Sequence, residues 1–146
     1  MAPQSPQSFE NHGRLLPGFH FVAFPLLALN LLYAAYEAIA HFGLATVFGL
    51  ALALGVILVA LFARVMALTV QDRVIRLEER LRLRALLPAD LQGRIEEFSV
   101  KQLVAMRFAG DGELPALARK VLDERLEDQK AIKRLVQNWR ADYQRA

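Results

Sequence analysis

The residue types that most often carry chemistry are few and scattered in this sequence. There is no cysteine, and the three histidines are His12, His20 and His41. None of them lies three or four residues from another, so no two share a helix face as metal ligands. The adjacent acids Glu78–Glu79 and Glu96–Glu97 would point about 100° apart on a helix and do not face each other. We therefore predict no catalytic site, no cofactor and no metal, and we expect a protein that is not an enzyme.

Two polar residues stand out because their surroundings are apolar. His20 lies among phenylalanines, where an imidazole could ligate a haem or a chlorophyll magnesium if a partner enclosed the pigment. A lone histidine is more often hydrated or bonded to a carbonyl, and both alternatives stay open. Asn30 lies in the middle of an apolar run. Its amide should seek a partner, which is either the neighbouring helix of the same chain or another protein or pigment.

A stripe of arginines follows the apolar region. Arg73, Arg76, Arg80 and Arg84 are three or four residues apart and share one side of a helix. Such a stripe is either a solvated face near anionic lipid headgroups or a set of bidentate partners for carboxylates on another subunit.

The charged residues that surround these candidates are segregated along the chain. Residues 15–63 hold one charge, Glu37, whereas residues 64–146 hold 17 Lys or Arg and 13 Asp or Glu. This distribution excludes a simple globular enzyme and a disordered chain, and it indicates a membrane part and a polar part. The pI of about 9.6 does not indicate nucleic-acid binding, because acidic residues alternate with the basic ones.

Two uncharged runs are long enough to cross a bilayer. Residues 15–36 and 38–63 hold no charged side chain, and a membrane helix needs about 20 apolar residues. We predict two transmembrane helices over roughly 15–39 and 44–70, joined by a tight turn at 41–43. A signal peptide is the alternative for the first run, but its apolar core would be shorter, about 7–15 residues. Pro25 should bend the first helix.

The second helix should continue past the membrane. Val70, Val74, Leu77 and Leu81 recur at spacings of four, three and four, which is typical of a coiled-coil seam. The residue before Pro88 avoids helical geometry, so we predict a continuous helix from about 44 to 86. Within the membrane, Gly49 and Ala53 are small residues at four-residue spacing that allow close helix contact, within the hairpin or with another subunit.

The rest of the chain is predicted to form short helices that dock on the second helix or on a partner. One should span about 88–98, and a second begins at the capping box of Ser99 and Gln102 and runs through Phe108. A last helix should open at Leu114 and carry the apolar residues up to Trp139, which we place in a partner contact.

Together these elements predict an all-α fold: a transmembrane helical hairpin whose second helix extends into a small cytoplasmic helical domain. The predicted parts are a cytoplasmic segment over 1–14, the hairpin over 15–70 and the cytoplasmic domain over 71–146. Six arginines between Arg64 and Arg84 follow the second helix and none lies in the turn. Both termini are therefore expected in the cytoplasm of a bacterial inner membrane.

Three stretches of the sequence resemble an uncharacterised bacterial family of membrane proteins that carries only a domain-of-unknown-function label. They are residues 71–82, residues 102–109 with the following Asp111, Glu113, Leu114 and Pro115, and residues 7–12. The resemblance implies two transmembrane helices and a helical cytoplasmic tail, and no activity. In size and plan the chain is also similar to small accessory subunits of bacterial photosystem complexes.

Two functions remain open at this stage. The first is a non-catalytic accessory or scaffold subunit of a larger inner-membrane complex. A photosynthetic reaction-centre or antenna complex is one candidate for that complex. The second is a free-standing oligomeric membrane protein that binds anionic lipid through the arginine stripe. Expected partners are other integral membrane subunits and anionic lipids, and neither nucleic acid nor a small-molecule substrate is expected.

Overall fold

The computed structural model describes residues 7–11, 13 and 16–142, and these form helices with no named strand. They fall into two compact units, one drawn from residues 14–68 and the other from residues 1–13 and 69–146. The second helix contributes to both units, and each unit is described by itself below.

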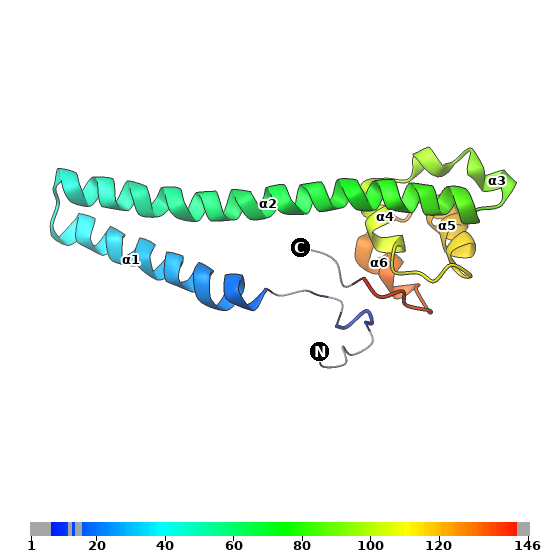
Figure 1. The fold of residues 1–146 in the computed structure, drawn as a ribbon, viewed down its shortest axis with the longest axis horizontal. Helices are drawn as coiled ribbons and strands as arrows, with labels where there is room; N and C mark the ends of the chain where they lie inside the picture. The colour runs from blue at the N-terminus through cyan, green and yellow to red at the C-terminus, as the bar shows by residue number, and fades with distance from the viewer. Residues whose placement is uncertain (1–6, 12, 14–15, 143–146) are drawn as a thin grey trace. The chain divides into compact units, whose positions relative to one another are not determined.

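The unit of residues 14–68 holds the predicted hairpin (Figure 1). A π-helix, η1 (Gly18–Ala23), leads into α1 (Phe24–Ala40), and α2 (Leu44–Leu86) starts after the turn at 41–43. The predicted turn and the predicted span of the second helix are confirmed. Thr46 closes the turn, because its Oγ1 accepts a hydrogen bond from the Gly43 N–H at 3.0 Å.

The disturbance expected at Pro25 takes the form of a change in hydrogen-bond pattern. The Phe24 N–H donates to the Phe19 carbonyl, five residues back, at the junction between η1 and α1. Pro25 is the second residue of α1, directly after η1, and because it lacks an N–H the helix loses one backbone hydrogen bond to the carbonyls of η1 at this point. The proline therefore sits at a switch from π to α geometry.

The other unit is built on the C-terminal part of α2. Its short helices are α3 (Ala89–Gln92), the 3₁₀ turn η2 (Ile95–Glu97), α4 (Val100–Met106), α5 (Leu114–Asp123) and α6 (Gln129–Arg134). Leu83 of α2 and Leu87, just after its end, belong to the same buried cluster as Leu103 and Met106 of α4 and Leu114 of α5. The short helices thus dock on the extension of the second helix. This is one of the two predicted alternatives, the other being a partner.

Three of the predicted helix boundaries in this unit are wrong. The helix expected over 88–98 is two pieces, α3 and η2, separated at Gly93 and Arg94. The helix that starts at the Ser99 capping box has both expected hydrogen bonds, but it ends at Met106 rather than Phe108.

The largest error concerns the last helix, which is not continuous from Leu114 to Trp139. Arg125 adopts a φ of 50°, and the Leu126 N–H donates to the Val121 carbonyl at 3.0 Å, so α5 closes in a Schellman-type turn without glycine. Asp128 then caps α6 by accepting from the Lys130 and Ala131 amides. The sequence has no glycine or proline near Arg125, so the apolar pattern on both sides of it predicts one continuous helix.

Candidate interaction surface on the second helix

The predicted arginine stripe divides into two pairs. Arg80 Nη2 lies 2.6 Å from Glu96 Oε2, and Arg84 Nη2 lies 3.6 Å from the other oxygen of the same carboxylate. Arg73 and Arg76 form no ion pair with any residue that the structure describes. For two of the four arginines the carboxylate is thus supplied by η2 of the same chain, and for the other two both predicted alternatives, a partner or lipid, stay open.

Arg82, which the stripe does not include, donates hydrogen bonds to three different residues. Its Nε and Nη2 donate to Asp111 Oδ1 at 2.8 and 2.6 Å, and Nη2 also donates to the Ala109 carbonyl at 2.6 Å. Nη1 donates to Glu79 Oε2 at 3.2 Å, and the Arg82 side chain is 10% exposed. This guanidinium therefore fastens the 109–111 turn to α2.

Glu79 is the buried acid of this arrangement. It is 5% exposed, and its second oxygen lies 3.9 Å from Arg140 Nη1. Burial raises the pKa of the Glu79 carboxyl, and the neighbouring Arg82 opposes that rise. Sequence reasoning treated Glu79 as one of two adjacent acids; its spacing of three from Arg82 was the signal that could have identified the pair.

The apolar seam on α2 stays uncovered in the chain. Val70, Val74, Leu77 and Leu81 are 60%, 49%, 62% and 56% exposed. The tail covers a different side of the helix, where Ile75 and Leu83 are buried. At 100° per residue, Leu81 and Leu83 lie about 160° apart around the helix axis. The seam is therefore a face to which no described part of the chain has docked.

The polar residues of the first helix differ in how they are satisfied. His20 Nδ1 lies 3.1 Å from the Leu16 amide nitrogen and 3.0 Å from the Leu16 carbonyl oxygen. The ring can therefore bond the Leu16 backbone in either neutral tautomer, which favours the backbone-bonded alternative over metal or pigment ligation. Asn30 is exposed on α1, and its side chain has no hydrogen bond to a residue that the structure describes. A bond to a partner stays a prediction.

The small residues of α2 do not act as one packed face. Ala53 is buried, together with Ile57, and lies on the packed side of the helix. Gly49 is exposed, and a Cβ added there would meet nothing within 4 Å. Gly49 is therefore not at a close crossing within the chain, and a role for it would need a partner helix.

Trp139 holds the C-terminal segment in place. Its ring packs on Phe108 with centroids 5.0 Å apart. It also pairs with Ala109 in an isolated antiparallel bridge, flanked by hydrogen bonds from the Gly110 and Arg140 amides. Part of the Trp139 surface that we predicted to contact a partner thus packs inside the unit.

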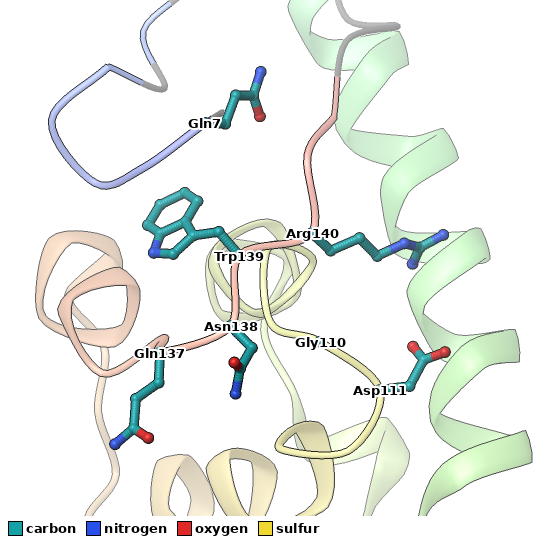
Figure 2. Close-up of a pocket in the computed structure, with 7 residues that line it drawn as sticks. All are labelled: Gln7, Gly110, Asp111, Gln137, Asn138, Trp139 and Arg140. Atoms are coloured by element: carbon teal, nitrogen blue, oxygen red, sulfur yellow. The ribbon is translucent and has the colours of Figure 1, made fainter. Parts of the chain in front are cut away.

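An open depression lies beside this bridge (Figure 2). It is lined by Gln7, Gly110, Asp111, Gln137, Asn138, Trp139 and Arg140. Figure 2 shows Asp111 and Arg140 both directed toward α2, where Arg82 and Glu79 pair with them. The two charged side chains that line the depression are therefore both engaged in ion pairs with α2.

Glu113 and Gln7 tie further segments to the unit. The Glu113 carboxylate accepts hydrogen bonds from the Gln137 and Asn138 amides, each at 3.0 Å. The Gln7 side chain exchanges two hydrogen bonds with the Asp142 backbone, at 3.0 and 2.9 Å. Neither role was visible in the sequence pattern, because both join residues far apart along the chain.

The comparisons with known proteins support one part of the sequence resemblance, the family of unknown function. Neither a curated protein nor a solved structure matches the chain. Among the residues that the structure describes, no group of three or more His, Cys, Asp or Glu side chains could hold a metal ion. The model of a family of unknown function, DUF6526, matches residues 1–146, and the chain belongs to that family.

Proposed function

We propose that the protein is a non-catalytic accessory or scaffold subunit of a larger bacterial inner-membrane complex. In this proposal α1 and the first part of α2 cross the membrane, and the unit built on the end of α2 lies in the cytoplasm. Both helices are long and apolar enough to cross, and their most apolar stretches are 0% and 11% buried. The core helix of a soluble protein would be mostly buried, so the exposure supports a membrane environment.

The observation that carries the scaffold role is the position of Asn30. It lies near the middle of the 23-residue span Gly18–Ala40, on the exposed face and with no hydrogen bond to a described residue. A side-chain amide in hydrocarbon is costly unless another helix satisfies it. A partner helix that bonds Asn30 is the simplest resolution, and lipid chains supply none.

Two features support the placement of both termini on one side. The Gln7 side chain bonds the Asp142 backbone, which supports placing the segments before α1 and after α2 in one compartment. The arginines that follow the membrane part of α2 favour the cytoplasm as that compartment. Arg14, the flanking charge before the first helix, lies outside the described residues.

The topology can be tested with cysteines, because the natural chain has none. A Gly43→Cys variant should react with a membrane-impermeant maleimide added to intact cells. A Lys101→Cys variant, exposed in the other unit, should react only after lysis. The reverse pattern would overturn the cytoplasmic placement.

The scaffold role can be tested by purification from native membranes in a mild detergent. We expect stoichiometric integral membrane partners, and their loss in an Asn30→Leu variant. Leu32→Ala, which changes another exposed residue of α1, is the matched control and should keep the partners. A wild-type chain that purifies alone would contradict the scaffold role, and bound pigment absorbance in the complex would narrow it to a photosynthetic assembly.

The second candidate function is binding of anionic lipid, which Arg73 and Arg76 favour. Neither has a carboxylate partner in the described chain, and each basic residue near an anionic surface contributes about 1 kcal/mol. Replacing both by lysine should preserve binding to phosphatidylglycerol vesicles, whereas replacing both by glutamate should abolish it. Arg80 and Arg84 are less informative, because Glu96 already neutralises them in part.

A further inference from the structure

We propose that the exposed seam of α2 pairs with the same seam of a second copy, as a parallel two-stranded coiled coil. The seam consists of Val70, Val74, Leu77 and Leu81. The parallel direction rests on the proposed function, because two copies inserted in one membrane with the same topology must present α2 in the same direction.

The spacing gives the seam a definite heptad register. Val70 and Leu77 occupy d positions, and Val74 and Leu81 occupy a positions, since d to a is four residues and a to d is three. All four side chains are about half exposed or more. The tail packs on the far side of the helix, through Leu83, so a second α2 can approach without displacing it.

The charges beside the seam select a second copy as the occupant. In this register Arg73 is a g position and Glu78 is the e position five residues later. In a parallel coiled coil, a g residue pairs with the e residue of the next heptad on the partner helix. Arg73 of each copy would therefore face Glu78 of the other, and both residues are exposed and form no ion pair with a described residue.

The same charges oppose the antiparallel alternative. Antiparallel pairing places g positions opposite g positions, and here both g positions beside the seam are arginines, Arg73 and Arg80. Like charges held opposite each other disfavour that arrangement, and Arg73 contributes most of the cost because Glu96 already neutralises Arg80 in part. The pattern thus discriminates between the two directions, which a seam of aliphatic residues alone would not do.

A seam of two heptads is too short to associate as a free peptide. Membrane anchoring changes this, because it fixes the orientation of α2 and confines the copies to a surface, which raises their effective concentration. We therefore expect pairing in the membrane or in a detergent micelle that holds two copies, and not between isolated segments.

Single-cysteine variants test the contact and its direction, and the absence of natural cysteines makes every disulfide assignable. In native membranes treated with copper phenanthroline, Val70→Cys and Leu77→Cys should each form disulfide-linked homodimers. Arg76→Cys, one residue away from the seam, is the matched control and should remain monomeric. Cross-linking only in a mixture of Val70→Cys and Leu81→Cys chains would indicate antiparallel pairing and would overturn the proposal.

A charge exchange tests the ion pair itself. With two symmetric pairs at about 0.5 kcal/mol each, Arg73→Glu or Glu78→Arg should raise the dissociation constant in detergent about fivefold. The double variant should return it to within about twofold of the wild type. Failure of the double variant to recover would overturn the assigned register, and a loss of lipid contact could not produce such recovery.

The outcomes separate this inference from the proposed function. A chain that stays in alkaline-washed membranes but gives no Leu77→Cys disulfide overturns the dimer and leaves the scaffold role standing. A chain that the alkaline wash releases overturns the membrane placement, and with it the parallel alignment. Disulfides at both seam positions together with membrane retention support both.

Discussion

Replacing Arg82 by methionine should destabilise the unit of residues 69–142 by about 3 kcal/mol. The substitution keeps much of the aliphatic volume and removes the guanidinium. Glu79, 5% exposed, would then have only Arg140 at 3.9 Å as a counter-charge. The Ala109 carbonyl would also lose the donor that reaches it at 2.6 Å.

The estimate follows from the burial of the pair. Breaking a buried ion pair by removing one partner costs about 3–5 kcal/mol, because the remaining charge is left in a poor solvent. The lower end applies here, since Arg140 is 57% exposed and can move toward Glu79. Arg84→Met is the matched control: its guanidinium is 62% exposed and 3.6 Å from Glu96, and its loss should change stability by less than about 0.5 kcal/mol.

The assay is urea unfolding of the full chain in detergent, followed by Trp139 fluorescence. Trp139 is the only tryptophan, and it packs on Phe108 beside the bridge to Ala109. Its emission therefore reports on the turn that Arg82 holds. Circular dichroism at 222 nm, recorded in parallel, separates loss of this turn from loss of the helices.

Acid provides a second test of the same reasoning. Burial raises the pKa of the Glu79 carboxyl, so its contribution to stability is largest below the ordinary glutamate pKa and is lost as the pH rises through the folded value. Without Arg82 the pKa of Glu79 is raised further and that loss is larger, so the difference in unfolding free energy between wild type and variant should narrow as the pH falls from neutral toward the ordinary glutamate pKa. A Glu79→Gln change in the Arg82→Met background should recover stability. If the unfolding free energies of the wild type and the Arg82→Met variant differ by less than about 1 kcal/mol at neutral pH, or if acid leaves the difference unchanged, the reasoning is refuted.

Four further changes have definite expected outcomes in the same unfolding assay. Ser99→Ala removes the capping box of α4 and should cost about 1 kcal/mol, whereas Ser99→Thr should retain most of it. Leu83→Ala opens a cavity at a fully buried position and should cost about 3 kcal/mol; a smaller loss than about 1 kcal/mol would show that the tail is not anchored there. Arg125→Gly relieves a φ of 50° and should stabilise the unit by about 0.5–1 kcal/mol, and destabilisation would count against the Schellman-type turn. The hydrogen bond from Arg119 lowers the pKa of the Asp90 carboxyl, so its contribution is present above the ordinary aspartate value of 3.8 and is lost as the pH falls through the folded value; any difference in midpoint between wild type and Asp90→Asn should therefore vanish in strong acid.

The parts of the fold that the sequence predicts are those governed by local rules. The two long helices follow from uninterrupted apolar runs and from Pro88, and the start of α4 follows from Ser99 and Gln102. The end of α5 at Arg125 was missed, because an arginine occupies a backbone conformation that glycine usually marks. Local pattern predicts where a helix can form more reliably than where tertiary contacts end it.

The candidate surface was predictable to a similar extent. Helical spacing alone places the arginines and the seam on faces of α2, and the structure keeps the seam uncovered. Spacing could not show that Glu96 takes up Arg80, or that Arg82 reaches Asp111, since these pairs join residues 16 and 29 positions apart. For the same reason the exposed amide of Asn30 could be identified as polar from sequence, but not as unsatisfied.

The link between Gln7 and Asp142 has a consequence for the order of folding. The two residues are 135 positions apart, and both hairpin helices lie between them. The contact can form only after the far end of the chain has been synthesised. If the hairpin crosses a membrane as proposed, the contact also requires both helices to have inserted in the right direction, because a hairpin with one helix on the wrong side would leave Gln7 and its acceptor in different compartments. Completion of the unit would then report correct insertion.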